Sequence, residues 1–487
     1  MDESTDPVRG AVVEADLAAA AARTGPWRML ATVVLADLAG LALAIAVAYA
    51  VRLLAGGHFK ADQIAALWPL PVLLLALYAG SRLYAVTPPH PAEELRRMTL
   101  ATTMAFIILV MATFFLRTGE LYSRIATVLA WGIALFSIPL TRMAIRSIAS
   151  RRRWWGVPLV VLGAGRTADL MVHALRRWPS RGLRPVLLLD DEPGKHGIPI
   201  AGIAVSGPID ELLPLAADCG IRHLMVAMPG APPDRLRRLW RLHGKRFPNV
   251  LLVPGLSEFA SLWVEAKDLG GNLALELRQS LLLPSRRFLK RLLDLLLVVI
   301  GGAVLLPALL GIALAVRATS RGPAFYSQRR LGMGGAEFRA WKFRTMCADA
   351  DAVLARYLAE DPVLREEWER DHKLRHDPRV TWIGRILRKT SLDELPQLWN
   401  VLIGDMSLVG PRPITAAEVP KYGDLWEFYQ RVRPGLTGLW QISGRNLTTY
   451  DERVAFDAFY VSNWSPWLDL VILARTVQTV LRGEGAY

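Results

Sequence analysis

The chain has 487 residues, with 58 Lys and Arg against 44 Asp and Glu, so its formal net charge at pH 7 is +14. Apolar residues make up 52% of the chain, and its mean hydropathy is +0.27. This composition excludes a wholly disordered chain and is atypical of an ordinary soluble enzyme, because it implies buried or lipid-facing spans. The length predicts about three domains. The positive charge alone leaves nucleic acid, an anionic membrane and phosphate-bearing substrates open as partners.

The two cysteines indicate a reducing compartment, and the N-terminus is informative about targeting. Cys219 and Cys347 are the two cysteines, and their wide separation predicts free thiols rather than a disulfide framework or a zinc site. The first residues, MDESTDPVRG, are acidic and lack a basic segment followed by an apolar core. No cleavable signal peptide is therefore expected.

Four long apolar stretches follow one another with short polar connections. Each is about long enough to cross a hydrocarbon core of ~30 Å as a helix rising 1.5 Å per residue. They are Met29–Leu54, Ile64–Tyr84, Met98–Leu116 and Ile125–Ile145. We expect a four-helix transmembrane bundle over residues 27–147 after a tail of residues 1–26, in preference to buried helices of a soluble domain.

Basic residues set the orientation of this bundle. One side carries Arg9, Arg23, Arg28, Arg82, Arg96, Arg97, Arg146 and Arg151–Arg153, and the other carries Arg52, Lys60, Arg117 and Arg124. The positive-inside rule places the richer side, with both ends of the bundle, in the cytoplasm. Asp37 in the first span is costly in lipid, so we expect it to face another helix, as a helix contact in preference to a functional site.

The pattern changes to a Rossmann-like α/β domain over residues 148–275. A short apolar run, Val157–Leu162, precedes the glycine-rich turn Gly163–Ala168, and a helical segment leads to a second apolar run ending at Asp190. This order is typical of a dinucleotide-binding βαβ unit on a parallel sheet. The third glycine of the fingerprint is replaced by Ala168, so both a bound nucleotide and an empty turn stay open.

A fifth apolar segment, Leu292–Val316, is as long as a span but has basic residues on both flanks. Because the positive-inside rule then places both ends in the cytoplasm, and Pro307 can kink or break the helix, we expect a re-entrant membrane helix over residues 288–317 rather than a crossing. Lys290, Arg291 and Asp294 at its entry suggest an ion cluster that engages lipid phosphate, although a solvated helix start fits the same pattern.

Two adjacent carboxylates, Asp393 and Glu394, stand out in the last third of the chain. Neighbouring helical side chains diverge by about 100°, so one can act as nucleophile while the other holds a metal. A position at a helix N-terminus would favour the ionised form. The alternative is a capping box formed by Ser391 and Glu394.

Cations and Gly/Pro-rich turns surround this pair in sequence. They include Lys342, Arg385, Arg388, Arg412, Arg433 and Arg445. Arginine forks match phosphate oxygens, and carboxylates among cations suggest metal-assisted phosphoryl transfer. A solvated basic face is the alternative. No nucleic-acid fold signature appears beside the membrane segments, so nucleic acid is not expected as a partner.

Five motifs together resemble one family. KRxxD at residue 290, KFRTM at 342, TSLDELPQL at 390, GDMSLVGPRP at 404 and RPGLTGLWQISGR at 433 resemble the bacterial sugar transferases, the monotopic polyprenyl-phosphate phosphoglycosyl transferases. The resemblance covers about residues 288–487, and the four spans with a Rossmann-like middle resemble its large members. Residues 361–413 and the end, VLRGEGAY, look closest to undecaprenyl-phosphate galactose phosphotransferases.

The resemblance implies a reaction in which UDP-hexose and undecaprenyl phosphate give undecaprenyl-diphospho-hexose and UMP, at the first membrane step of O-antigen or exopolysaccharide synthesis. Galactose is the implied sugar, and glucose is the alternative. By the same resemblance Asp393 is the nucleophile of a covalent phosphosugar intermediate, and Glu394 helps to bind Mg²⁺.

The remaining expected roles also follow from the family. The substrate-binding candidates are Lys342, Arg388, Arg412, Arg433, Gln441 and Arg445, and the membrane signature comprises Lys290, Arg291, Asp294 and Pro307. Small family members break the membrane helix at a Ser-Pro pair, whereas Leu306 precedes Pro307 here. The resemblance implies a bacterial inner-membrane protein, in contact with membrane lipids, whose α-rich catalytic domain (residues 276–487) lies on the cytoplasmic face. The large family members suggest a homodimer.

Two other function classes remain as alternatives. A membrane-bound nucleotide-sugar dehydratase or epimerase would need a second glycine fingerprint and a Tyr-x-x-x-Lys pair in the C-terminal half, and the sequence contains neither there. A non-catalytic assembly scaffold is the other alternative. The last segment, Trp464–Leu481, fits an interfacial helix and a packed core helix equally well.

Overall fold

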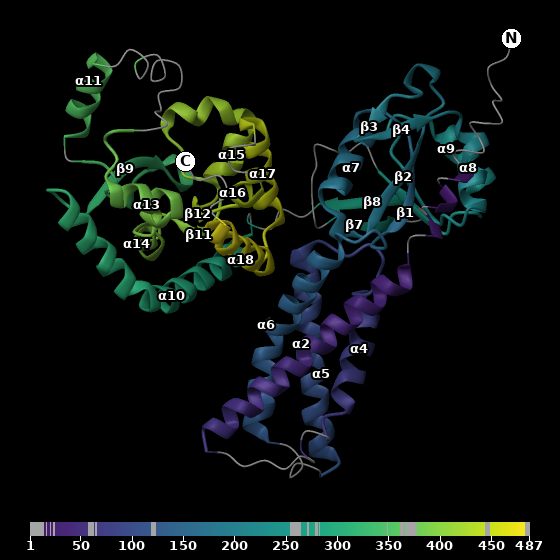
Figure 1. Cartoon of the computed structure of the whole chain (residues 1–487), viewed down its shortest axis with the longest axis horizontal. Coiled ribbons are helices and arrows are strands. Elements are labelled where there is room, and N and C mark those ends of the chain that lie inside the picture. Colours follow the sequence, from purple (N-terminus) through teal and green to yellow (C-terminus); the bar gives the residue numbers. More distant parts are fainter. Residues whose placement is uncertain are drawn as a thin grey trace. The chain divides into compact units, whose positions relative to one another are not determined.

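The computed structural model describes most of the chain in two compact units, Met1–Phe259 and Ala260–Tyr487 (Figure 1). The described residues are 14–15, 17–19, 21–22, 25–56, 63, 66–117, 123–253, 264–269, 272–277, 281, 283–347, 349–360, 365, 377–443 and 449–482. Cys219 and Cys347 are both free, as expected.

The first unit begins with a helical bundle. Its helices are α2 (Pro26–Leu54), α4 (Pro69–Gly80), α5 (Pro91–Phe115) and α6 (Arg124–Ala149). Three of them, α2, α5 and α6, are long and apolar enough to cross a membrane. The second expected span is shorter than predicted, because α4 has 12 residues and rises only about 18 Å. Residues Ala66–Trp68 form a turn before it, and proline occupies its first helical position.

Small residues allow α2 and α6 to pack closely. A Cβ on Gly40 would lie 2.7 Å from the Cα of Ile138, so only glycine fits there. The hydroxyl of Ser137 donates to the carbonyl of Gly40 at 2.8 Å. Close backbone approach of this kind is how apolar helices associate in lipid, where burial of apolar surface gives no driving force. Large apolar side chains such as Leu43 and Phe136 are exposed on the outside of the bundle. The protein is therefore a membrane protein.

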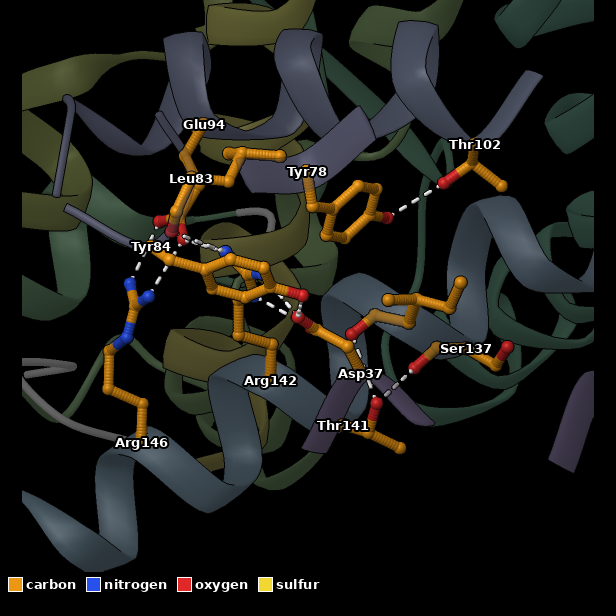
Figure 2. A network of polar contacts seen from close by, with 11 residues as sticks. Asp37, Tyr78, Leu83, Tyr84, Glu94, Thr102, Ser137, Thr141, Arg142 and Arg146 are labelled. Carbon is orange, nitrogen blue, oxygen red and sulfur yellow. Dashed lines mark hydrogen bonds and ion pairs between the residues drawn. The ribbon is translucent and has the colours of Figure 1, made fainter. Parts of the chain in front are cut away.

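Asp37 is at the centre of a buried ionic network within the bundle (Figure 2). Its carboxylate accepts from Arg142 Nε at 2.8 Å and from the Tyr84 hydroxyl at 3.0 Å. Arg142 also donates to Glu94 at 3.0 Å, and Glu94 pairs with Arg146 at 2.8 Å. The network joins α2, α5 and α6 with the residues after α4. The expectation that Asp37 makes a helix contact is confirmed.

The α/β domain of the first unit contains a six-stranded sheet in the order β3-β4-β2-β1-β5-β6. Its strands are β1 (Val157–Leu162), β2 (Leu183–Leu189), β3 (Pro199–Ile200), β4 (Ile203–Ser206), β5 (His223–Val226) and β6 (Asn249–Leu252), and its helices are α7 (Arg166–Arg177), α8 (Ile209–Asp218) and α9 (Pro233–His243). All pairs are parallel except β3 with β4. The predicted parallel α/β fold is thus confirmed.

The glycine-rich turn of this domain is held by the protein itself. Gly163 has a φ of +97°, and a Cβ there would lie 2.6 Å from Met228 Cγ. The Asp190 carboxylate accepts from the backbone N–H of Ala164 at 2.7 Å and from the Lys195 ammonium at 3.4 Å. One amide of the turn is therefore already bonded to an internal anion.

The second unit starts with a hairpin of β7 (Val264–Leu269) and β8 (Asn272–Leu277), so the predicted domain boundary at residue 275 lies within β8. The elements that follow are α10 (Pro284–Thr319), β9 (Phe325–Leu331), β10 (Glu337–Phe343), α11 (Ala350–Glu360), α13 (Trp382–Thr390), the 3-10 turns η6 (Leu392–Glu394) and η7 (Ala416–Leu425), α14 (Gln397–Ile403), β11 (Ser407–Val409), α15 (Trp426–Gln430), β12 (Gly435–Thr437), α16 (Leu439–Ser443), α17 (Tyr450–Asn463) and α18 (Pro466–Arg482).

Helix α10 is one bent helix of 36 residues that continues through Pro307 (Figure 1). Of the two effects expected of Pro307, a kink or a break, the break does not occur, because one helix runs through the proline. By length and composition this helix is also a candidate membrane span. Its C-terminal part packs Val316 into a core with Phe343 and Leu387, and its N-terminal part contacts α14 and β11. Between these contacts, apolar side chains such as Val304 are exposed.

The last helix, α18, packs into the second unit. Trp464, Leu468 and Ile472 are each at most 1% exposed. Of the two alternatives for this segment, the packed core helix is therefore the one observed.

Candidate active site

Asp393 and Glu394 lie in a tight turn between two helices. Helix α13 ends at Thr390, and Ser391 adopts a left-handed backbone conformation with a φ of +54°. The one-turn 3-10 helix η6 then carries both acids. The Ser391 side chain makes no capping hydrogen bond, so the alternative of a capping box is wrong, and the helix that starts after Ser391 is a single 3-10 turn rather than an α-helix. The chain turns too sharply here for an α-helix to begin at Ser391.

Lys342 faces the acidic pair from strand β10. Its ammonium lies 2.6 Å from a carboxylate oxygen of Glu394 and 4.0 Å from one of Asp393. All three side chains are partly exposed, at 24%, 30% and 14% for Lys342, Glu394 and Asp393. The KFRTM and TSLDELPQL motifs, which are separated by about 50 residues, therefore form one site that a ligand can reach.

Asn400 on α14 fixes β10 against the acidic turn, and the sequence analysis missed it. This residue is fully buried. Its amide oxygen accepts from the N–H of Trp341 at 3.1 Å, and its amide nitrogen donates to the carbonyl of Arg339 at 2.8 Å. These bonds hold the strand next to Lys342. The available signal was the two amides, Gln397 and Asn400, in the apolar run QLWNVLI, because buried amides need partners.

Burial controls the charge state of Asp393. It raises the pKa of this carboxyl to about 6, an effect that the nearby Lys342 and Arg388 cations oppose and the neighbouring Glu394 carboxylate reinforces. The desolvation cost therefore outweighs the groups that favour the ionised form. A raised pKa in a reachable site marks a group suited to chemistry.

Arg388 reaches the same site from α13. Its Nε donates to the Thr345 hydroxyl at 2.9 Å, and its charge acts on Asp393. Gly384 permits this approach, since a Cβ there would lie 2.0 Å from the carbonyl oxygen of Thr345. Two cations, from β10 and α13, therefore accompany the carboxylates.

The other predicted substrate residues lie in separate surroundings. Arg412 stacks over Trp440 at 5.5 Å. Burial and the charge of Arg412 lower the pKa of Arg330, and the charge of Glu394 raises it. Arg330 is a further cation near the acidic turn that the sequence analysis missed. The carboxamide oxygen of Gln441 is buried without a hydrogen-bond partner. Arg445 lies outside the described residues.

Arg433 belongs to a different cluster, at the start of α10. Its Nε donates to the carbonyl of Gly404 at 2.7 Å, and its charge interacts with Arg291 and Asp294 rather than with Asp393. Arg291 itself donates to the carbonyl of Leu402 at 2.9 Å. This cluster attaches α10 to the segment around Gly404.

Lys290 and Asp294 point into the protein. Both are less than 9% exposed. The Lys290 ammonium lies 2.8 Å from Asp469 of α18 and 3.5 Å from Asp294. Asp294 also accepts from the Ser407 hydroxyl at 2.7 Å. The expected ion cluster exists, and its partners in the structure are protein groups of α18 and β11, because a buried charge requires a partner.

The donor set fits a magnesium ion only in part. Among the described residues no group of three or more His, Cys, Asp or Glu side chains could hold a metal. Asp393 and Glu394 provide adjacent carboxylates, and Mg²⁺ commonly binds through one or two carboxylates together with substrate phosphates. The site therefore fits a metal that arrives with a diphosphate rather than a metal held by protein alone.

Two family models match parts of this chain. Residues 285–483 match the family model for bacterial sugar transferases, and residues 88–254 match one for a CoA-binding domain. A UDP-galactose-lipid carrier transferase of Erwinia amylovora is 35% identical over 79% of this chain and 81% of its own length.

Two further relatives cover similar lengths. The undecaprenyl-phosphate galactose phosphotransferase of Salmonella typhimurium is 36% identical over 75% of this chain and 77% of its own length. A UDP-glucose:undecaprenyl-phosphate glucose-1-phosphate transferase of Xanthomonas campestris is 32% identical over 78% of this chain and 79% of its own length. Because these relatives are each more than 30% identical to this chain and are covered over more than two thirds of their own length, the chain belongs to the bacterial sugar transferase family and is an enzyme.

Proposed function

We propose that this protein transfers hexose-1-phosphate from a UDP-sugar to undecaprenyl phosphate, with galactose as the hexose. The observation that carries the proposal is the turn in which Lys342 contacts both Asp393 and Glu394. The relatives named as a UDP-galactose-lipid carrier transferase and an undecaprenyl-phosphate galactose phosphotransferase support the substrates. The relative named as a glucose transferase makes UDP-glucose the alternative donor.

The proposed reaction has two displacements at one phosphorus atom. In the first, a carboxylate oxygen of Asp393 attacks the phosphorus that bears the sugar. The bond from that phosphorus to the bridging oxygen breaks, UMP leaves, and a covalent phosphosugar–aspartyl ester remains. In the second, a phosphate oxygen of undecaprenyl phosphate attacks the same phosphorus. The Asp393 carboxylate leaves unchanged, and the product is undecaprenyl-diphospho-hexose.

Neighbouring groups prepare Asp393 for this role. Lys342 and Arg388 favour its ionised form and lie where they can neutralise phosphate oxygens. Glu394, with Asp393 beside it, would hold Mg²⁺ together with the diphosphate. When bound, the ion supplies positive charge that stabilises the developing charge on the phosphate oxygens. Arg412, Arg433, Gln441 and Arg445 complete the proposed substrate contacts.

Helix α10 is proposed to enter one leaflet and return. Both of its ends contact the same folded unit, through Lys290 with Asp469 and through Val316 with Phe343. An exposed apolar stretch lies between these ends. A straight crossing would carry one end about 54 Å from the other, to the opposite side of the bilayer. The return brings the acidic turn to the membrane surface, on the cytoplasmic face of the inner membrane.

The test uses the purified full chain and separates the two steps. Incubation with UDP-galactose and Mg²⁺, without undecaprenyl phosphate, is expected to release about one UMP per chain and to add the mass of hexose phosphate to the protein. Peptide mass spectrometry is expected to place the adduct on Asp393. UMP release that strictly requires undecaprenyl phosphate, with no adduct, would contradict the covalent mechanism.

A panel of donors tests the sugar. UDP-galactose and UDP-glucose are compared at equal concentration in the presence of undecaprenyl phosphate, and kcat/KM is measured for each. A higher value for UDP-galactose is expected. A higher value for UDP-glucose would reassign the donor and leave the reaction class unchanged.

A further inference from the structure

A pocket of about 240 Å³ lies where the transmembrane bundle meets the α/β domain, within the first unit. It is formed by the first turns of α2, the connection between α4 and α5, the end of α6, and residues just before β1 and β2. Its lining is mostly apolar and includes Trp27, Leu30, Val33, Tyr84, Val86 and Trp155. A pocket with such walls accepts a hydrocarbon chain.

The pocket lies at the level where the membrane helices end. Helix α2 begins at Pro26, α5 begins at Pro91 and α6 ends at Ala149. On the rim of the pocket, Trp27 is 67% exposed and Leu30 is 45% exposed. Exposed tryptophan at the end of a membrane helix is typical of the lipid headgroup region. A lipid can therefore enter from the bilayer.

Two arginines, Arg28 and Arg181, lie on the segments that form this pocket, while Arg146 in the lining is paired with Glu94. The Arg28 guanidinium lies 5.4 Å from the ring centre of Trp27. Arg181 lies between two lining residues, Ser180 and Gly182. Within the described part of the chain, neither Arg28 nor Arg181 has an acidic oxygen within 4 Å, and Glu94 is the one acid whose charge acts on Arg181. Arginines without acidic partners at a membrane surface attract anionic headgroups.

The two walls of the pocket are held in contact by close backbone packing. Gly182 has a φ of +74°, and a Cβ there would lie 2.7 Å from the carbonyl oxygen of Val86. The N–H of Gly25 donates to the carbonyl of Trp154 at 3.5 Å. The pocket is thus a fixed part of the first unit.

We propose that this pocket binds one anionic phospholipid from the leaflet at this end of the bundle. One acyl chain fills the apolar pocket, and the phosphate lies beside Arg28 and Arg181. This site is separate from the acidic turn of the second unit, so the proposal does not depend on the proposed catalytic function.

The test measures lipid binding to the full chain in detergent after delipidation. Phosphatidylglycerol and phosphatidylcholine are supplied with the same photoreactive acyl chain, and cross-linked peptides are identified by mass spectrometry. Phosphatidylglycerol is expected to cross-link to the first turns of α2 and to residues 84–88. Phosphatidylcholine is expected to cross-link about fivefold less, the equivalent of roughly 1 kcal/mol for one arginine near an anionic headgroup.

Two pairs of variants test the two parts of the site. Ala85 is exposed on the wall of the pocket, so Ala85→Trp places an indole at the opening and is expected to reduce cross-linking at least about fivefold. Ala55→Trp, at an exposed alanine after the other end of α2, is the matched control. Arg181→Gln is expected to reduce the preference for phosphatidylglycerol, and Arg166→Gln, at the exposed start of α7 after β1, is its control.

Several results would overturn the proposal. These are equal cross-linking by both lipids, cross-links that avoid the pocket lining, or an Ala85→Trp variant that binds as the unchanged protein does. Competition experiments add one more arm, because displacement of phosphatidylglycerol by a lower concentration of undecaprenyl phosphate would assign the pocket to the isoprenoid lipid instead. If Ala85→Trp fails to fold, the Arg181→Gln pair alone decides the outcome.

Discussion

Two groups of charged side chains in this protein differ in how fully their acids are paired with cations. In the bundle, Asp37 and Glu94 are balanced by Arg142 and Arg146, and both acids are bonded to their cations deep in the protein. In the second unit, Asp393 and Glu394 share mainly Lys342, which lies 4.0 Å from Asp393. The first network is complete and therefore holds helices together, whereas the second is incomplete and partly exposed, and so can accept a ligand.

The largest effect is expected when the Asp393 carboxylate is removed from the incomplete group of the second unit. Asp393→Asn is expected to reduce the rate of UMP release at least about 10³-fold, because an amide cannot act as the nucleophile. The chain should still fold, since Asp393 makes no buried ion pair as close as those of the bundle. Asp451→Asn, at an exposed position at the start of α17, is the matched control. Unchanged turnover in Asp393→Asn would contradict the mechanism.

Breaking the complete network is expected to affect stability instead. Arg142→Met leaves Asp37 without its main cation, and removal of one partner of a buried ion pair costs about 3–5 kcal/mol. Thermal unfolding of the full chain in detergent is the measurement, and a clearly lower midpoint is expected. Arg124→Met, at the exposed start of α6, is the control. A midpoint equal to that of the control would show that the network does not hold the bundle.

Asn400 connects stability to catalysis within the second unit. Asn400→Leu removes both bonds that hold β10, leaving the N–H of Trp341 and the carbonyl of Arg339 unpaired, at a cost of about 1–3 kcal/mol each. We expect a lower unfolding midpoint and, at a temperature where the variant is folded, slower UMP release because Lys342 is displaced. The exposed Asn249→Leu in the other unit is the control. Loss of stability with full turnover would contradict the positioning role.

The smallest expected effect is the pH dependence. Because the pKa of Asp393 is raised to about 6, its reactive ionised form is lost below that pH, and the rate should fall about tenfold per pH unit. The folded chain binds this proton more tightly than the unfolded chain, so the contribution of Asp393 to stability decreases as pH rises between about 4 and 6. Initial rates between pH 5 and 8 test the first statement.

Removing the Lys342 cation should shift the pH at which the rate begins to fall, which we call the acidic limb of the pH profile. Lys342→Gln eliminates a charge that lowers the pKa of Asp393, so the limb is expected at a higher pH than in the unchanged protein. A limb that stays in place would mean that Lys342 does not act on Asp393.

Motifs and hydrophobic patterns identified much of this protein without a structure. The family, the acidic pair, the parallel α/β domain and three long membrane helices follow from local sequence, because spacing and apolar periodicity are local properties. The length of α4 did not follow, since an apolar run contains no clear signal for where its helix begins. The left-handed turn at Ser391 was also missed, because residues outside glycine and asparagine rarely adopt it.

What only the tertiary structure decided are the pairings between distant segments. Lys342 meets Glu394 across 52 residues, Lys290 meets Asp469 across 179, and Arg142 meets Asp37 across 105. The sequence by itself determined which charges exist and that the apolar spans must bury or pair them. Which charge meets which, and therefore which group stabilises a helix and which remains available to a substrate, depends on how the helices and strands pack, because a charge is compensated by what lies near it in space.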